Sequence, residues 1–262
     1  MSARKAAIVT GSGTGVGAAT ARALARRGYD VLVNYSKSEA EAKSAAQACR
    51  DAGADVLLGQ GDVTEDAACR RLVESALGRW NKLDLLVNNA GITTFVGSSN
   101  WEALDAESFQ RIFAVNLIGA FQMVRAAAPH LKSARGAIVN VSSIAGALGI
   151  GSAVPYIASK GALNSLTLHL ARVMAPEVRV NAVCPGLITT QWFPRGIGEE
   201  NYAKLKAGYE AGAPLGRAAS AEEVADAVVW LAEAGTVTGE LLLLDSGMHL
   251  GSAMRTVVPP RS

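Results

Sequence analysis

Residues 6–17 read AAIVTGSGTGVG, an apolar run that passes directly into a loop with four glycines. The apolar part predicts a short buried strand, and the alanine-rich segment after the loop predicts a helix that ends at Gly28. Gly11 can make the tight turn out of the strand. Gly15 and Gly17 remove side chains where backbone must come close to a ligand or to the strand. The stretch therefore predicts a strand–loop–helix unit.

The same alternation of short apolar runs and longer helical patterns continues along the chain. We expect further strands at 30–35, 54–60, 83–89, 136–143, 178–186 and 239–245. We expect further helices at 39–53, 64–80, 108–131, 156–174 and 220–233. Because the strands are continuously apolar, they suit a parallel sheet buried on both faces. The prediction is a single-domain Rossmann fold over 1–262, an α/β fold with a doubly wound seven-stranded parallel sheet and helices on both faces.

Two segments depart from this alternation. Residues 190–219 are polar, interrupted by glycine and proline and only weakly periodic, so we expect an inserted substrate loop or lid there. Trp192 and Phe193 could line that lid, or equally belong to the core or to a subunit contact. The final segment, 251–262, is expected to be a loose tail.

The glycine loop has the features of a dinucleotide-binding site. A helix that begins directly after it offers free backbone N–H groups and a partial positive charge to a pyrophosphate. A merely flexible turn is the alternative. Four glycines at alternate positions between a strand and a helix favour the dinucleotide site.

The end of the second predicted strand bears on which nicotinamide cofactor is used. An NAD-binding unit would place an acid there for the ribose 2′-hydroxyl. Here Asn34, Tyr35 and Ser36 supply no acid, and Lys37 is placed to meet a 2′-phosphate with Ser36 as a hydrogen-bond donor. This favours NADP(H), with NAD(H) as the alternative if Lys37 is simply a solvated loop lysine.

Composition and charge narrow the class of protein. The 262 residues have a formal net charge of +2 without a basic run typical of nucleic-acid binding. We see neither a signal-peptide pattern nor a stretch approaching the roughly 20 apolar residues of a membrane span. The scattered cysteines and histidines match no metal spacing. We therefore expect a cytoplasmic protein with reduced thiols, no metal and a small-molecule substrate, and without nucleic-acid or membrane partners.

A tyrosine and a lysine lie one helical turn apart in PYIASKGAL, residues 155–163. On a helix, Tyr156 and Lys160 share a face, and a nearby cation favours the phenolate. Ser143 ends the fifth predicted strand, at the edge where open parallel sheets bind ligands, and its hydroxyl could hydrogen-bond a substrate oxygen. On the residues alone, Ser142 or Ser143 could instead be a structural turn residue. With Tyr156 and Lys160, however, the pattern predicts proton transfer beside a hydride-carrying cofactor.

Six motifs occur in order along the chain: TGSGTGVG (10–17), NNAG (88–91), VN (115–116), NVSS (140–143), YIASK (156–160) and PGLITT (185–190). In order and spacing they resemble those of the short-chain dehydrogenase/reductase family, over nearly the whole chain. Within that family the chain looks similar to 3-oxoacyl-[acyl-carrier-protein] reductase-like and sugar-dehydrogenase-like members. The resemblance implies an NAD(P)-dependent alcohol dehydrogenase or ketoreductase, and a homotetramer or homodimer.

The resemblance also implies roles for individual residues. Tyr156 would be the general acid/base, Lys160 would tune it and bind the cofactor ribose, and Ser143 would donate to the substrate carbonyl. Asn116 would hold a water that links Lys160 to solvent, and Asp62 would contact the adenine. The residues expected at the cofactor are Gly11, Ser12, Thr14, Gly15, Val16, Asn34, Ser36, Lys37, Asp62, Val63, Asn89, Ala90, Gly91, Tyr156, Lys160, Pro185, Gly186, Ile188 and Thr190.

Two positions depart from the family pattern. Relatives that use NADP often carry a basic residue in the glycine loop, where this chain has the uncharged Thr14, and this weakens the preference for NADP(H). DSG at 245–247 replaces the usual DGG and affects a turn more than the chemistry. The alternatives are a non-catalytic dinucleotide-binding regulatory protein on the same fold, and a sugar epimerase or dehydratase, for which the short chain lacks room for a substantial nucleotide-sugar domain.

Overall fold

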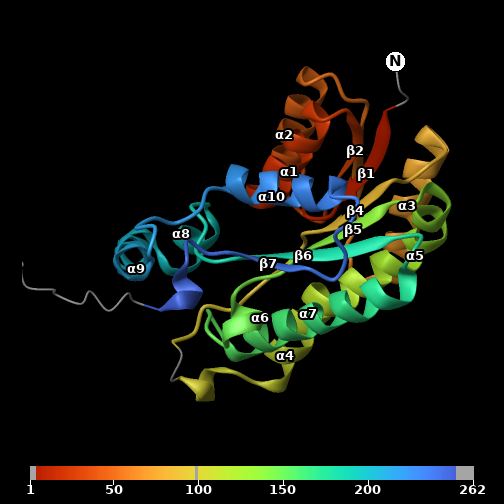
Figure 1. Cartoon of the computed structure of the whole chain (residues 1–262). Helices are drawn as coiled ribbons and strands as arrows, with labels where there is room; N and C mark the ends of the chain where they lie inside the picture. Colours follow the sequence, from red (N-terminus) through yellow and green to blue (C-terminus); the bar gives the residue numbers. More distant parts are fainter. Residues whose placement is uncertain (1–3, 98–99, 252–262) are drawn as a thin grey trace, which may run out of the picture.

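The computed structural model describes residues 4–97 and 100–251 and contains a seven-stranded parallel sheet (Figure 1). The strand order is β3-β2-β1-β4-β5-β6-β7. The strands are β1 (Lys5–Val9), β2 (Tyr29–Tyr35), β3 (Val56–Gln60), β4 (Leu85–Asn88), β5 (Ala137–Val141), β6 (Arg179–Pro185) and β7 (Leu241–Leu244). The main helices are α1 (Gly15–Arg26), α2 (Glu39–Asp51), α3 (Asp66–Trp80), α4 (Ala106–Phe113), α5 (Ala120–Ala134), α7 (Val154–Met174) and α10 (Ala221–Glu233). The predicted Rossmann fold is confirmed.

Helices cover both faces of the sheet, with α1, α2 and α10 on one face and α3, α5 and α7 on the other (Figure 1). Successive residues of a strand enter opposite cores. Val9 and Val31 pack in the core under α1, whereas Ile8 and Leu32 pack in the core under α3. This arrangement explains why the strand sequences are continuously apolar.

The order in which successive strands are added to the sheet reverses at β1. β2 pairs with one side of β1 and β4 with the other, and the chain after β1 and the chain after β4 lead to helices on opposite faces of the sheet. Open α/β sheets bind ligands at this switch point, outside the carboxyl ends of the strands. The fold therefore places the glycine loop and the segment after β4 at a ligand-binding edge.

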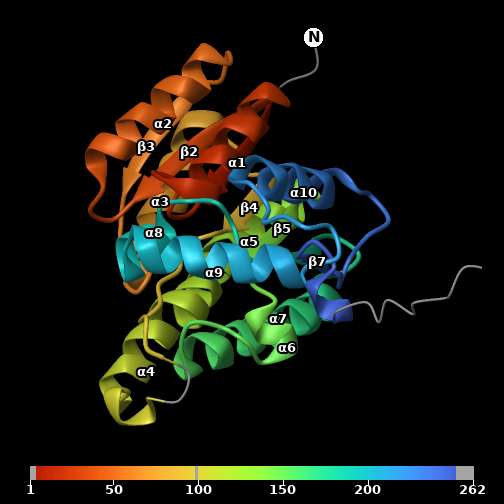
Figure 2. The same ribbon diagram turned by 90° about the vertical axis from the view of Figure 1, so that its left-hand side faces the viewer.

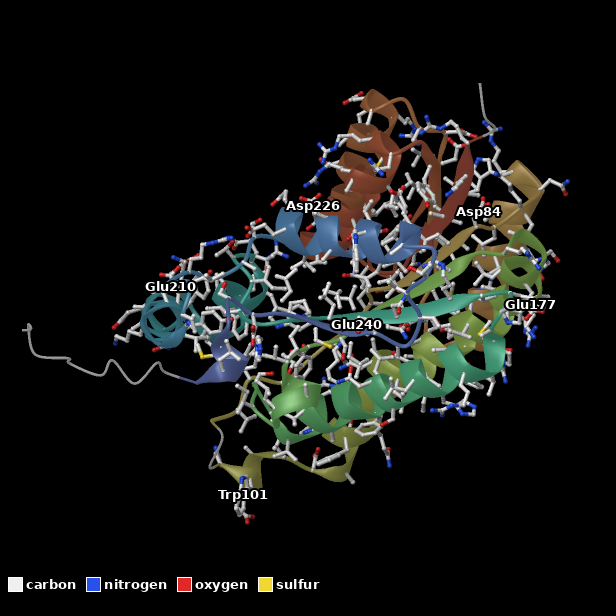
Figure 3. All side chains as sticks on the ribbon, in the orientation of Figure 1. Asp84, Trp101, Glu177, Glu210, Asp226 and Glu240 are labelled. Atoms are coloured by element: carbon white, nitrogen blue, oxygen red, sulfur yellow. The ribbon has the colours of Figure 1, made fainter. Side chains whose placement is uncertain are left out.

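Residues 190–219 cross this carboxyl edge as two helices, α8 (Trp192–Ile197) and α9 (Glu199–Gly212) (Figure 2). Asp84 and Glu177, which precede β4 and β6, lie at the opposite edge from Glu210 of α9 (Figure 3). No residue of α9 is fully buried against the rest of the described chain, so its sequence lacks the apolar period that would have predicted a helix.

The helix expected at 108–131 is longer than its sequence pattern indicated. A π-helical segment, η2 (Ala114–Gly119), joins α4 to α5 in one run, Ala106–Ala134. By length and composition this run could cross a membrane, so the expectation that no stretch is apolar enough is wrong here. The core helix of a globular fold passes the same test, and α5 contributes Met123 and Leu131 to the core under the sheet.

The start of α7 and the C-terminal segment can be compared with their predicted bounds. The helix expected from residue 156 begins at Val154, with Pro155 in its first turn, where a missing N–H is tolerated. Beyond Gly251, the predicted tail lies outside the described residues.

Candidate active site

The glycine loop folds closely against the segment after β4. Gly11 and Gly15 have φ values of +61° and +54°, in the left-handed region that favours glycine. A Cβ on Gly17 would lie 2.5 Å from the Gly11 carbonyl oxygen and would also collide with the Asn89 amide nitrogen. Glycine at these positions therefore lets α1 begin directly against the loop.

Two of the predicted cofactor residues have side chains that hold the loop in shape. Ser12 Oγ donates to the Val9 carbonyl at 2.7 Å and accepts from the Asn34 N–H at 3.0 Å. Asn34 Oδ1 accepts from the Gly11 N–H at 3.0 Å, and its amide donates to two carbonyls near the end of β3. Because these polar groups are buried and already paired, the two side chains position the loop backbone.

Asn89 and Ala90, after β4, are fixed to the same loop. The Asn89 amide donates to the carbonyls of Thr10 and Gly11 at 2.9 and 3.0 Å. The Thr10 hydroxyl accepts from the backbone N–H groups of Asn89 and Ala90, both at 3.0 Å. The NNAG motif thus locks the two ligand-binding loops together.

The N-terminus of α1 fits an anionic ligand. Thr14 is the N-cap residue of α1, and in the described structure its side chain accepts no hydrogen bond from the first turn of the helix. That first turn, which includes Gly15 and Val16, contains no acidic residue. In contrast, α10 begins with a capping box formed by Ser220 and Glu223. The uncapped N–H groups and the helix dipole of α1 suit the phosphates of a dinucleotide.

The end of β2 carries an exposed cation. Ser36 and Lys37 are both exposed, and within residues 4–97 and 100–251 the Lys37 ammonium makes no ion pair. Asp62, after β3, uses Oδ1 to accept from the N–H and hydroxyl of Thr64 at 2.9 and 2.8 Å. Val63 beside it is buried. Lys37 is therefore available to a ligand, and half of the Asp62 carboxylate is committed to a turn.

Ser143 and Tyr156 meet at the carboxyl end of β5. Ser143 Oγ accepts from the Ala145 N–H at 3.1 Å and donates to the Pro185 carbonyl at 3.4 Å. Burial raises the pKa of the Tyr156 hydroxyl above its ordinary value, while a hydrogen bond with the Ser143 side chain lowers it. With burial the larger effect, Tyr156 is protonated at neutral pH.

Lys160 lies behind Tyr156 on α7. Its Nζ donates to the Val141 carbonyl at 2.8 Å and lies 5.7 Å from the centroid of the Tyr156 ring. Burial lowers the pKa of Lys160 from 10.5 to about 8. A Cβ on Gly91 would lie 3.7 Å from this nitrogen, so the glycine keeps the space beside the ammonium free.

Asn116, in η2, connects the segment after β4 to α7. Its side chain accepts from the Ile92 N–H at 2.8 Å and donates to the Ile92 carbonyl at 3.0 Å. The same amide nitrogen donates to Ser159 Oγ at 3.0 Å, and Ser159 donates to the Tyr156 carbonyl at 2.8 Å. Both amide hydrogens of Asn116 are therefore occupied, and the side chain fixes the backbone of Tyr156.

The segment after β6 closes the site on the other side. Thr190 faces the glycine loop, because a Cβ on Gly15 would lie 3.8 Å from its methyl group. Ile188 forms a β-bridge with Ala219, which joins the two ends of the 190–219 excursion. At Gly186, a Cβ would collide with the hydroxyl of Tyr209 from α9, so this predicted cofactor residue has a packing role as well. Pro185 is buried.

Sequence reasoning did not identify the buried polar groups that support the site. Ser159 is one, and Ser142 is another: its Oγ donates to Asn164 Oδ1 at 2.6 Å, behind Lys160. Asn88 donates to Asn140 at 2.9 Å, which donates to Thr167 at 2.8 Å. Polar residues in or directly after apolar strands, as in NNAG and NVSS, were the available signal for Asn88, Asn140 and Ser142, whereas Ser159 and Thr167 lie on helix α7.

The cysteines are thiols without a ligand role in the described structure. All three, Cys49, Cys69 and Cys184, are free and buried, and burial raises the pKa of each to about 11. Over residues 4–97 and 100–251, no group of three His, Cys, Asp or Glu side chains is placed to hold a metal.

Comparison with known proteins assigns the chain to a family. Residues 11–249 match the family described as enoyl-(acyl carrier protein) reductase. A protein named as ketoacyl reductase 2 of the granaticin polyketide synthase, from Streptomyces violaceoruber, is 42% identical over 93% of this chain and 96% of its own. The chain belongs to the short-chain dehydrogenase/reductase family.

Other short-chain dehydrogenases/reductases resemble this chain over a similar length. An L-fucose dehydrogenase from Bos taurus is 37% identical, over 95% of this chain and 91% of its own. The crystal structure of a Burkholderia xenovorans protein described as a member of the same family matches with a TM-score of 0.88 and 37% sequence identity. The match covers 96% of this chain and 100% of that chain. This chain is accordingly an NAD(P)-dependent oxidoreductase of alcohols and ketones.

Proposed function

We propose that this protein is an NADP(H)-dependent oxidoreductase that interconverts a ketone and a secondary alcohol, with Tyr156 as general acid/base. The observation that carries the proposal is the convergence of Tyr156, Ser143 and Lys160 at the carboxyl end of β5. A bound nicotinamide cofactor would supply or accept the hydride.

In this proposal, Tyr156, Ser143 and Lys160 together move the proton to or from the substrate oxygen. In reduction, the protonated Tyr156 hydroxyl gives its proton to the substrate oxygen while Ser143 hydrogen-bonds that oxygen. The Lys160 charge stabilises the phenolate that remains, and this lowers the cost of giving up the proton. In oxidation, Tyr156 takes the proton from the alcohol.

The cofactor site is proposed to extend from α1 to the segments after β4 and β6. The uncapped α1 terminus at Thr14, Gly15 and Val16 would hold the phosphates, and Asp62 would face the adenine. Support for NADP(H) comes from Lys37, an exposed cation without an ion pair in the described ranges, next to the Ser36 hydroxyl. Gly91, Ile188 and Thr190 would line the nicotinamide side.

We further propose a lid and a self-assembly. The α8–α9 segment would cover a small-molecule substrate, since it crosses the carboxyl edge of the sheet (Figure 2), and Ser143 follows β5 at that edge. Exposed apolar side chains on the joined helices η2–α5 and on α7, including Ile118, Phe121 and Leu168, support a homo-oligomer such as a tetramer. Cytoplasmic localisation remains a prediction from the sequence.

The test is Tyr156→Phe, with cofactor binding and turnover measured separately across a screen of ketones and alcohols. The proposal expects cofactor binding to persist while turnover falls by about 10³-fold or more. If wild type binds cofactor but transfers hydride to no compound in the screen, the alternative is favoured: a non-catalytic dinucleotide-binding regulatory protein on the same fold.

A further inference from the structure

An aromatic contact joins α8 to the segment after β4. Phe95 packs on Gly196 so closely that a Cβ on this glycine would overlap the phenyl ring. The Phe95 and Phe193 rings are 5.5 Å apart at an interplanar angle of 60°. Phe193 in turn stacks on Tyr202 of α9 at 6.5 Å. We call Phe95, Phe193 and Tyr202 the aromatic cluster.

The sheet topology places this contact at the same edge of the sheet as the site. Phe95 follows β4 and Gly196 follows β6, and β5 lies between these two strands. Both segments leave the sheet at its carboxyl edge, so their contact, a bridge between the two segments, lies on the side of the sheet where Ser143 meets Tyr156 at the end of β5.

The β4 side of this bridge is fixed to the segment that leads into α7. The hydroxyls of Thr93 and Ser152 are 2.6 Å apart, and the Val96 N–H donates to the Ser152 carbonyl at 3.4 Å. Ser152 lies four residues before Tyr156. Phe95 is therefore held in a fixed relation to the helix that carries Tyr156.

The lid side of the bridge is held mainly at its base. Thr189 N–H donates to the Ala219 carbonyl at 2.9 Å, and the Tyr209 hydroxyl donates to the Asp245 carbonyl at 2.6 Å. Among described residues, only Pro194 of α8 is fully buried. On α8, the packing of Phe95 against Gly196 is a contact that an opening lid must break.

The groups beside the bridge suit an apolar ligand. The aromatic cluster presents three half-buried rings with a single hydroxyl, that of Tyr202. The neighbouring hydroxyls of Thr93 and Ser152 bond to each other, and Thr94 Oγ1 accepts from Arg111 at 3.1 Å. Hydroxyls of a polyhydroxylated substrate that lie against these rings would lose water without gaining a partner from them, which is costly.

We propose that packing of Phe95 against Gly196 holds the α8–α9 lid closed. We also propose that the aromatic cluster favours a ketone or secondary alcohol that carries an apolar ring or chain, in preference to a sugar. The substrate class rests on the proposed function, whereas the closing contact does not.

The test compares Gly196→Ala with Gly208→Ala, a glycine of α9 whose added Cβ meets nothing within 4 Å. With 2-decalol as substrate, we expect Gly196→Ala to lower kcat/KM by about 10-fold or more and Gly208→Ala to leave it within about 2-fold. Phe95→Ala removes the ring that the new methyl would strike. In that background Gly196→Ala should therefore cause no further loss. A neutral Gly196→Ala, or strict additivity in the double variant, overturns the closing contact.

The substrate class is tested with 2-decalol and L-fucose as alternative alcohols. We expect wild type to oxidise 2-decalol with the higher kcat/KM, and Phe95→Ala to reduce that preference. A higher kcat/KM for L-fucose overturns the substrate class. If neither compound is oxidised, the proposed function is decided separately by the screen of ketones and alcohols, and calorimetry of 2-decalol binding in the presence of NADPH decides the substrate class. Binding that weakens in Phe95→Ala supports the aromatic cluster, and absent binding overturns it.

Amide hydrogen exchange of 192–197 tests the closing contact without turnover. Gly196→Ala should speed exchange there and Gly208→Ala should not, whereas equal exchange in both variants contradicts closure by Phe95.

Discussion

Lys160 Nζ lies 5.7 Å from the centroid of the Tyr156 ring and donates to the Val141 carbonyl at 2.8 Å. The cation is thus held by the end of β5 at a fixed position behind the tyrosine. Its charge can act on the phenol through space, because the surrounding protein excludes water and screens weakly.

Burial of this cation predicts a dependence of folding stability on pH. Because burial lowers the folded pKa of Lys160 from 10.5 to about 8, the folded state binds the proton less tightly than the unfolded state. The resulting destabilisation is fully present below about pH 8 and disappears as the pH rises toward the unfolded value. Its size is on the order of 3 kcal/mol.

Lys160→Met isolates this effect, because the variant lacks the titrating group. Urea denaturation of both proteins at about pH 7 and about pH 10 should show wild type gaining stability relative to the variant at the higher pH. A stability difference that does not change with pH would contradict the buried, titrating lysine.

Ser159→Ala tests the connection from Asn116 to the Tyr156 backbone. Losing the hydroxyl leaves a buried Asn116 amide hydrogen without its acceptor, so we expect a loss of about 1–3 kcal/mol in stability. If Ser159 positions Tyr156, kcat should also fall by about 10-fold with little change in KM.

Ser75→Ala is the control, since Ser75 likewise bonds back along its helix, to the Arg71 carbonyl, but is exposed and lies on α3. Ser159→Thr, which keeps the hydroxyl, should recover kcat. Unchanged kcat in Ser159→Ala would limit Ser159 to a structural role.

Lys37→Gln tests the proposed 2′-phosphate contact. If Lys37 contacts the 2′-phosphate, removing its charge should raise the KM for NADPH by about 10-fold. The KM for NADH should stay nearly unchanged, because NADH has no 2′-phosphate. Lys43→Gln on α2 is the matched control, because Lys43 is paired with Glu39. Equal effects of Lys37→Gln on both cofactors, or a wild-type preference for NADH, would contradict the assignment.

Gly17→Ala and Gly78→Ala form a matched pair for the glycine loop. A methyl group on Gly17 would strike the Gly11 carbonyl and Asn89, so this variant should lose about 1–3 kcal/mol of stability together with cofactor affinity. Gly78 is exposed within α3 and meets nothing within 4 Å, so alanine there should stabilise by up to about 1 kcal/mol. Denaturant unfolding and cofactor titration measure the stability and the cofactor affinity of both variants. If the two variants showed the same stability and affinity, close packing at Gly17 would be contradicted.

The sequence was sufficient to predict the sheet, because its seven apolar runs are separated by helical patterns with clear glycine ends. It also brought Ser143, Tyr156 and Lys160 into one hypothesis, because motif spacing reports which residues end strands or share a helix face. Helix α9 was not predicted, because a helix with no buried residue has no apolar period to read.

The roles of Asn34, Asn89 and Ser159 could not be predicted either. Whether a buried polar side chain faces a ligand or pairs with backbone depends on neighbours that are distant in sequence. Asn34, for example, joins the glycine loop to the end of β3, contacts that no local pattern encodes.

The most direct test of the account is the ratio of turnover to cofactor binding in Tyr156→Phe. Fluorescence titration with NADPH, followed by steady-state turnover of a ketone that wild type reduces, supplies both values. We predict a cofactor Kd within about 3-fold of wild type and a kcat lower by about 10³-fold or more. A kcat close to that of wild type would contradict Tyr156 as the proton donor.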